Sequence, residues 1–492
     1  MTRRPEDRYP LVSGSGGFSA EPQGRPATVR EKSPESDTEV PVRAPRPRGR
    51  LAAVLVALTA ALAACSTGST GSPSAAPGAP LPPIELEGDW TWTKQEAALE
   101  LGVTHTQKSL DESDSDPDAR RRGMDILAGD SAIWQNHHLM GFGTDNPEPE
   151  PGEYDWETLD RRMKITEETG QRTMLTLCCS PDWMKGGEEG ETDWDELEEA
   201  PRPEHFADFA RLSAEAVKRY PQVERVMVWN ELKGFWDEAK GRWDYEGYTE
   251  LYNQVYRAVK EVRPDVQVGG PYVVLIGLDQ GARDTSTTVA GPWGAADQRT
   301  LDVVDYWLQN NVGADFLAVD TATNKRDQDG PAPVDGARKF ADLARWLQER
   351  SDLPIWWAEY YPEVPAGEDD EPTSPVNAAV NLAAIAAMAE SGTAGALLWG
   401  PQEHDLGSPA LWTDATREGG GQPLPLTQAW QFLVPRLAAG DVEIGRSPSR
   451  PHLLAFRAND GVVVVNLSGD QVELAPGKPL TPWQIQVGGR ES

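Results

Sequence analysis

Two glutamates stand directly after apolar runs that are typical of buried strands. Glu231 follows the run Val226 to Trp229 and a single Asn230, and Glu359 follows "IWWA". An unpaired buried carboxylate is expensive, so a charge at the end of such a run needs a partner or a purpose. Two neighbouring carboxylates can divide acid–base and nucleophilic chemistry between them. That division requires elements that carry both residues to one edge of the fold.

Apolar runs alternate with amphipathic stretches along most of the chain. This alternation predicts an α/β fold, a closed (β/α)8 TIM barrel over residues 86–438 rather than an open doubly wound sheet. Active sites of such barrels lie at the carboxyl ends of the strands. We therefore expect Glu231 and Glu359 to face each other at the roughly 5 to 5.5 Å typical of a retaining glycosidase. The strand-like runs begin at Gly102, Ser131, Thr173, Val226, Val266, Asp315, Ile355 and Ala394.

The pattern "VWNE", a carboxylate at strand seven and a tryptophan ending strand eight resemble clan A of the glycoside hydrolases. From the residues alone, either glutamate could hold the proton. The resemblance implies that Glu231 is the acid/base, Asn230 binds the sugar 2-hydroxyl and Glu359 is the nucleophile. It also implies that Trp399 is the aromatic floor under the sugar. "GVTHTQ", "LTLCCSPDWM" and a small C-terminal β module make family 39, the β-xylosidase and α-iduronidase group, the most similar family.

Two positions depart from the family pattern. Leu232 follows Glu231 where family members usually have proline, and strand six ends in Asp320 where relatives often have histidine. These departures leave the preferred sugar open, and they do not touch the two glutamates.

Other side chains near the predicted barrel mouth are candidates for sugar contacts. We expect one of His137 and His138 to point into the mouth, and we favour His138. His105 is a weaker candidate on strand one. A uronic acid would need a basic partner in the pocket. The remaining candidates are Trp183 and Trp236 as pocket walls and Lys185, Lys233 and Arg242 as basic partners.

The N-terminal segment reads as an export and anchoring signal. Residues 1–50 have the composition of a disordered extension. Residues 51–65 form a short apolar run that ends in "LAAC" and resembles a bacterial lipoprotein signal, with Cys65 as the lipidated residue. Residues 66–85 then form a flexible tether. The prediction is a lipid-anchored protein on the outer face of the cell membrane; the alternatives are a plain secretory signal or an uncleaved signal anchor.

Composition narrows the range of partners. The formal net charge of −33 makes nucleic acid an unlikely partner. We predict no metal and no cofactor, and an oligo- or polysaccharide as the substrate. Cys178 and Cys179 are interpreted as small apolar residues, because sequence neighbours seldom form an unstrained disulfide. The acidic stretch 186–200 is interpreted as a solvated insertion.

The leading hypothesis is therefore a retaining glycoside hydrolase, and a β-xylosidase is one form of it. A catalytically inactive carbohydrate-binding lipoprotein and a transglycosylase are the alternatives. Residues 439–492 are predicted to form a small β-sandwich-like module, because short strand-like pieces there are separated by turn residues.

Overall fold

The computed structural model describes residues 81–129, 132–324, 333–362, 375–403 and 410–490. The predicted extension (1–50), the signal segment (51–65) with Cys65, and residues 66–80 of the tether lie outside these described residues. None of the described helices is both long enough and apolar enough to cross a membrane.

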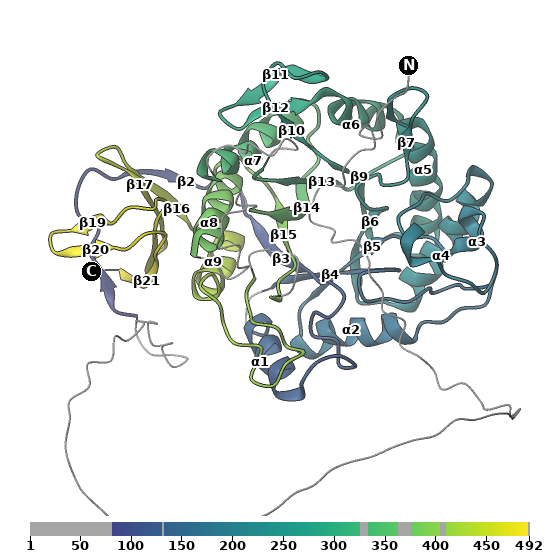
Figure 1. Ribbon diagram of the computed structural model, residues 1–492, viewed down its shortest axis with the longest axis horizontal. Coiled ribbons are helices and arrows are strands. Elements are labelled where there is room, and N and C mark those ends of the chain that lie inside the picture. Colours follow the sequence, from purple (N-terminus) through teal and green to yellow (C-terminus); the bar gives the residue numbers. More distant parts are fainter. Residues whose placement is uncertain (1–80, 130–131, 325–332, 363–374, 404–409, 491–492) are drawn as a thin grey trace, which may run out of the picture. The chain divides into compact units, whose positions relative to one another are not determined.

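Eight parallel strands close into a barrel, which confirms the predicted fold (Figure 1). Each strand pairs with its predecessor along the chain, and the ring closes where the last strand pairs with the first, from Gly395 opposite Glu100 to Trp399 opposite Thr104. The barrel strands are β3 (Glu100–Thr104), β4 (Trp134–His138), β5 (Arg172–Leu177), β6 (Val223–Val228), β9 (Gln267–Val274), β13 (Phe316–Ala322), β14 (Ile355–Tyr361) and β15 (Gly395–Trp399).

Helices follow the strands and surround the barrel (Figure 1). Local sequence sets their ends: Asp116 caps the first helix by accepting from the amide of Ala119, and Gly170 ends the second in the left-handed conformation. Residues 377–389 of helix α8 are all buried, so this helix has mostly apolar side chains on every side. The helices are α1 (Pro117–Leu127), α2 (Glu157–Thr169), α4 (Phe206–Arg219), α5 (Tyr245–Val262), α6 (Gln298–Asn310), α7 (Pro333–Gln348), α8 (Pro375–Glu390) and α9 (Thr427–Ala439).

Three connections at the carboxyl ends of the strands carry extra elements. They lengthen the rim of the barrel on the side where an active site would lie. After β5 come α3 (Asp182–Lys185), η2 (Trp194–Glu196) and η3 (Pro203–His205); after β6 comes the hairpin β7 (Trp236–Asp237) and β8 (Arg242–Trp243); after β9 come β10 (Gly277–Leu278), β11 (Thr285–Gly291) and β12 (Gly294–Asp297).

Strands from both ends of the described chain form the β module. Its six-stranded sheet has the order β1-β21-β18-β17-β16-β2, beside a two-stranded sheet of β19 and β20. The sequence analysis assigned residues from 86 onward to the barrel, but Thr91–Lys94 pair with β16 instead. Local patterns do not reveal such a long-range pairing. The strands are β1 (Pro83–Ile84), β2 (Thr91–Lys94), β16 (Glu443–Ser447), β17 (Arg450–Arg457), β18 (Gly461–Asn466), β19 (Val472–Ala475), β20 (Lys478–Leu480) and β21 (Ile485–Arg490).

Candidate active site

Glu231 lies on a tight turn immediately after β6. Trp229, Glu231 and Leu232 all have positive φ, at 69°, 51° and 52°. Such backbone is strained for residues other than glycine and clusters at functional sites. The turn is held by the Trp229 indole, which donates to the carbonyl of Lys233 at 2.8 Å, and by the Lys233 amide, which donates to the carbonyl of Asn230 at 3.0 Å. Proline cannot adopt a φ near +52°, which explains why Leu232 stands where the family pattern has proline.

Glu359 faces the barrel interior because β14 contains a bulge. Trp356 and Ala358 both belong to the interior cluster, so simple alternation would turn Glu359 outward. The register between β13 and β14 shifts there, from Val319 opposite Trp357 to Asp320 opposite Glu359. The extra residue places Ala358 and Glu359 on the same side. The side chain of Glu359 is 3% exposed.

The structure brings three carboxyl groups together at the mouth of the barrel. One oxygen from each of Glu231, Asp320 and Glu359 lies within 4.8 Å of the other two. An approach of two carboxyl oxygens to within 4.8 Å is compatible with the roughly 5 to 5.5 Å of a retaining glycosidase and is shorter than the roughly 6.5 to 9.5 Å of an inverting one. Asp320 was noted in the sequence only as a departure from the family pattern. It ends a buried strand, which is the same signal that identified Glu359.

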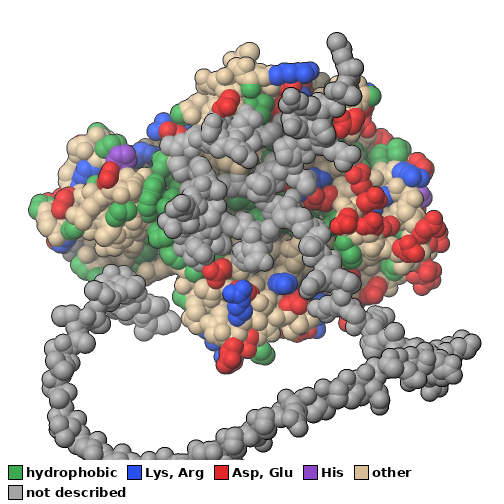
Figure 2. Space-filling model, in the orientation of Figure 1, with side chains coloured by type: hydrophobic (Ala, Val, Ile, Leu, Met, Phe, Trp, Pro, Cys, Tyr) green, Lys and Arg blue, Asp and Glu red, His purple; other side chains and the backbone are tan. Residues whose placement is uncertain are grey.

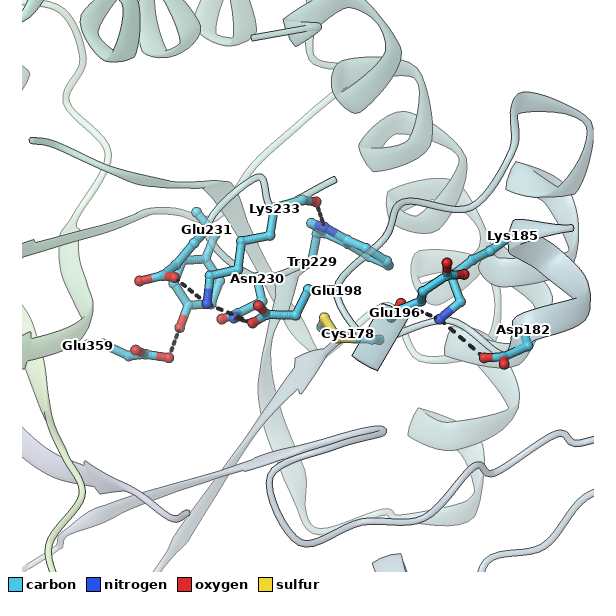
Figure 3. The surroundings of a disulfide bond; sticks show 12 residues. Cys178, Asp182, Lys185, Glu196, Glu198, Trp229, Asn230, Glu231, Lys233 and Glu359 are labelled. Carbon is cyan, nitrogen blue, oxygen red and sulfur yellow. Dashed lines mark hydrogen bonds and ion pairs between the residues drawn. A yellow bond between two sulfur atoms is a disulfide. The ribbon is translucent and has the colours of Figure 1, made fainter. Parts of the chain in front are cut away.

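Lys233 is the cation of this site. Its ammonium lies 2.8 Å from Glu231 Oε2 and 2.6 Å from Glu198 Oε1 (Figure 3). Asn230 Nδ2 also donates to Glu198 Oε1, at 3.4 Å, while Asn230 Oδ1 is buried without a partner among the described residues. Most of the stretch 186–200 is exposed, yet Glu198 packs against the site. The interpretation of the whole stretch as a solvated insertion is therefore wrong for Glu198.

The three carboxyls differ in electrostatic environment. Burial opposes ionisation of Glu231, but the ammonium of Lys233 and a hydrogen bond from Asp320 hold the pKa of Glu231 below its usual range. Burial raises the pKa of Asp320 well above its usual range, and the charges of Glu231 and Glu359 add to this. Burial and the charge of Glu231 likewise raise the pKa of Glu359. Glu231 is therefore the first of the three carboxyls to ionise as the pH rises.

Two tyrosines contact the cluster of three carboxyls, each at a different glutamate. Tyr272 lies at a bulge in β9, between Pro271 opposite Ala318 and Val273 opposite Val319, and has φ of 47°. Its hydroxyl donates to Glu359 Oε1 at 2.5 Å. The Tyr361 hydroxyl lies 3.4 Å from Glu231 Oε1. Tyr272 was not among the predicted site residues, although Gly-Gly-Pro inside a strand-like run is a signal for a bulge.

An aromatic group lies at the end of β15. Trp399 is buried with Phe142, Ala322 and Tyr361, and its ring packs edge-on against Phe142 at 5.5 Å and His138 at 6.3 Å. Both ring nitrogens of His138 are buried without a hydrogen-bond partner among the described residues. Burial, with Arg162 and Lys233, lowers the pKa of His138 to about 3, so the ring is neutral. These two side chains can offer a sugar an apolar face and a polar atom.

Several other predicted residues lie away from the carboxyls. His137 points to α2, where Nε2 contacts Thr166 Oγ1 at 2.9 Å, and its ring stacks on His105. His105 is held between Ser109 and Gln135. The remaining residues take structural partners: the Trp183 indole donates to the Glu148 carbonyl, Trp236 packs on Trp243, Lys185 pairs with Asp182, and Arg242 pairs with Glu246.

The interpretation of Cys178 and Cys179 as separate apolar residues is wrong. They form a disulfide at the end of β5, with Cα atoms 3.0 Å apart across a cis peptide bond. The cis bond brings both side chains to one side of the backbone, which the general rule for sequence neighbours does not consider. Both residues are fully buried.

Among the described residues, the same three carboxyls are the one group of potential ligands close enough to hold a metal ion. The ammonium of Lys233 already supplies a positive charge beside Glu231.

Comparison with known proteins supports the fold. No protein-family model matches the chain, and no curated protein matches it. A monomeric β-xylosidase from Caulobacter crescentus CB15 aligns with a TM-score of 0.52 and 18% identity over 76% of this chain and 75% of that chain. A GH39 β-xylosidase from Caulobacter crescentus gives 0.50 and 18% over 80% and 81%. A conserved exported protein from Bacteroides fragilis gives 0.51 and 12% over 81% and 97%. The chain thus shares the TIM-barrel fold of these solved structures.

Proposed function

We propose that the protein is a retaining glycoside hydrolase that cleaves O-glycosidic bonds by double displacement. The observation that carries this proposal is the approach of Glu231, from the end of β6, to Glu359, from the end of β14, within 4.8 Å. That separation leaves room for a sugar carbon but not for an attacking water between the carboxyls.

In the proposed mechanism, ionised Glu359 attacks the anomeric carbon while protonated Glu231 gives its proton to the leaving oxygen. Water, deprotonated by Glu231, then releases the sugar from Glu359. Tyr272 orients Glu359 through its 2.5 Å hydrogen bond. Trp399 supports the apolar face of the sugar, and the free Oδ1 of Asn230 accepts from a sugar hydroxyl.

Uncharged glycosides are the favoured substrates. Among the residues that the structure describes, the site combines Glu198, Glu231, Asp320 and Glu359 with the ammonium of Lys233, which already contacts two of these carboxyls. An anionic sugar would meet repulsion there. Two of the structural neighbours are β-xylosidases, so β-xylosides are our first choice.

A panel of aryl glycosides that varies one sugar at a time tests the proposal. We expect turnover of a neutral glycoside, with an aryl β-xyloside as the first candidate, and little turnover of the matching glucuronide. Azide should rescue Glu359→Ala as a glycosyl azide of inverted configuration and Glu231→Ala as one of retained configuration. Undiminished turnover by either variant would contradict the assignment.

Carbohydrate binding without turnover is a second candidate, and one observation favours it. The ion pair with Lys233 keeps Glu231 ionised, whereas an acid catalyst must hold a proton. Calorimetry with xylose and xylobiose, run beside the glycoside panel, separates the two candidates: heat of binding without product would favour a binding protein.

We also propose that the protein is anchored outside the cytoplasm through a lipid on Cys65, on the strength of the "LAAC" signal. Mass spectrometry of the mature N-terminus tests this. A diacylated Cys65 is expected, and an intact signal segment would contradict it.

A further inference from the structure

The site holds a third carboxyl that double displacement does not require. Asp320, in β13, is fully buried, and neither of its oxygens receives a hydrogen bond from a donor that the structure describes. Its neighbours within 4.8 Å are the carboxyls of Glu231 and Glu359. A buried carboxylate without donors beside two others is very unfavourable. Asp320 therefore carries a proton in the free protein.

The proton on Asp320 has a preferred acceptor. Glu359 Oε1 already accepts from Tyr272 at 2.5 Å. Glu231 is held as a carboxylate by Lys233 at 2.8 Å, and it accepts a hydrogen bond from Asp320. The raised pKa of Asp320 and the lowered pKa of Glu231 agree with this direction.

Lys233 has a second carboxylate within reach. Its ammonium is 2.6 Å from Glu198, which belongs to the acidic stretch after α3. If Lys233 contacts Glu198 alone, Glu231 loses its counter-charge and becomes the better base of the pair with Asp320. The position of one ammonium thus controls where a shared proton lies.

We propose that Asp320 and Glu231 act as one acid pair that shares a single proton, and that Lys233, held by Glu198, determines which carboxyl carries it. This inference rests on the proposed hydrolase. Asp320 is a positioning residue in this account, since it acts through Glu231.

The protons balance through both steps. At the start, Asp320 holds the proton and Glu231 and Glu359 are ionised. The O–H bond of Asp320 breaks as one forms on Glu231, and Glu231 passes that proton to the glycosidic oxygen while Glu359 bonds to the anomeric carbon. The attacking water then returns a proton to Glu231, the bond to Glu359 breaks, and the proton goes back to Asp320.

Within the described part of the chain, five charged or titratable groups face the pair. They are Lys233 after β6, Glu198 from the stretch after α3, Tyr272 from β9, and Glu359 and Tyr361 from β14.

The test is the pH profile of kcat/KM for phenyl β-xyloside, whose poor leaving group needs the acid. Asp320→Asn removes the proton store and leaves Glu231 beside Lys233. We expect its alkaline limb to move down by about one pH unit or more. Lys233→Met removes the positive charge beside Glu231, so both limbs of its pH profile should move to higher pH. The profile of the double variant, Asp320→Asn with Lys233→Met, should lie between those of the two single variants.

Lys185→Met is the matched control. Lys185 is also a buried, ion-paired lysine, 3.2 Å from Asp182, but it points away from the carboxyls (Figure 3). Its profile should coincide with that of the parent protein. If Asp320→Asn keeps the parent's alkaline limb, or if Lys185→Met shifts the profile as Lys233→Met does, the proposal is wrong.

A second measurement does not depend on turnover. Infrared difference spectra between neutral and alkaline solution should contain the C=O band of a protonated carboxyl that Asp320→Asn abolishes. The parent protein lacking that band would overturn the inference. If the band is present but no glycoside is cleaved, the proposed hydrolase fails while the shared proton stands.

Discussion

The two ends of the barrel differ in how their charged side chains are paired. At the amino-terminal end, Glu100 pairs with Arg172 at 3.0 Å and Arg225 at 3.2 Å, and the Trp134 indole donates to it at 3.1 Å. Both guanidinium groups stack on Trp134, at 3.8 and 4.2 Å from the ring centroid. Glu100, Arg172 and Arg225 thus all have partners.

Among the described residues at the carboxyl end, three carboxyls lie close together beside the ammonium of Lys233, and buried polar atoms of Asp320, Asn230 and His138 receive no hydrogen bond. Much of the acidic surface in Figure 2 also lies on the side of α3 and α4, beside this rim. A satisfied network stabilises a fold, whereas an unsatisfied one is kept where it does chemistry. The contrast identifies the functional end without reference to any relative.

The largest expected effect is on turnover. Glu359→Gln keeps the shape of the side chain but removes the proposed nucleophile, so kcat should fall by about 10⁴-fold or more. Glu100→Gln makes the same change at the other end and should leave kcat within about twofold. Steady-state rates on one aryl glycoside check both. Equal losses in the two variants would erase the distinction between the ends.

The next largest effect is expected from loss of the Tyr272 hydroxyl, which donates to Glu359. Tyr272→Phe should lower kcat/KM by about 10²-fold, as the loss of one positioned donor typically does. The hydrogen bond from Tyr272 lowers the pKa of Glu359, so its loss should raise that pKa and move the acidic limb of the pH profile upward. An unshifted acidic limb would mean that Tyr272 does not control the ionisation of Glu359.

The Glu→Gln change should alter the free energy of unfolding in opposite directions at the two ends of the barrel. Glu100→Gln weakens two ion pairs that are partly exposed, and we expect a loss of about 1 to 2 kcal/mol in the free energy of unfolding. Glu359→Gln removes a buried acid from a crowded site and should raise that free energy by about 1 kcal/mol at neutral pH. Urea unfolding of both variants at one pH measures the signs.

The pH dependence of the free energy of unfolding provides a control for the comparison of Glu100→Gln with Glu359→Gln. Asp320 and Glu359 have folded-state pKa values above those of the unfolded chain. Their contribution is fully present below about pH 4, and it is lost as pH rises through the folded values. Glu359→Gln should flatten this fall above about pH 4, and an unchanged slope would place the stabilisation elsewhere.

The smallest effect compares two adjacent histidines. His138→Ala should raise KM by about fivefold, since about 1 kcal/mol is typical of one hydrogen bond to a ligand. His137→Ala removes a contact to Thr166 on α2, so it should lower stability without changing KM. The reverse result would place His137 at the sugar.

The order of elements was predictable from the sequence. Most barrel strands lie in largely apolar runs, as in β14, and each barrel strand is followed by a helical pattern. The position of Thr91–Lys94 was not predictable from local sequence, because it depends on pairing with Glu443–Arg446 at the far end of the chain.

Within the site, the sequence identified the carboxyls that end strands and missed the groups that tune them. Tyr272 and the orientation of Glu359 depend on bulges, which shift alternation by one residue and are set by strand register. Glu198 reaches Lys233 from a stretch whose composition is that of a solvated loop. The Cys178–Cys179 disulfide spans a cis peptide bond that no local sequence pattern predicted.

The most direct test of the account is to trap the proposed covalent intermediate. The protein is incubated with 2-deoxy-2-fluoro-xylosyl fluoride, whose fluorine slows release of the sugar, and is then digested and sequenced by mass spectrometry. The account predicts a fluoroxylosyl ester on Glu359 and none in Glu359→Gln. A stable ester on Glu231 or Asp320, or turnover of the fluoride without any labelled carboxyl, would contradict it.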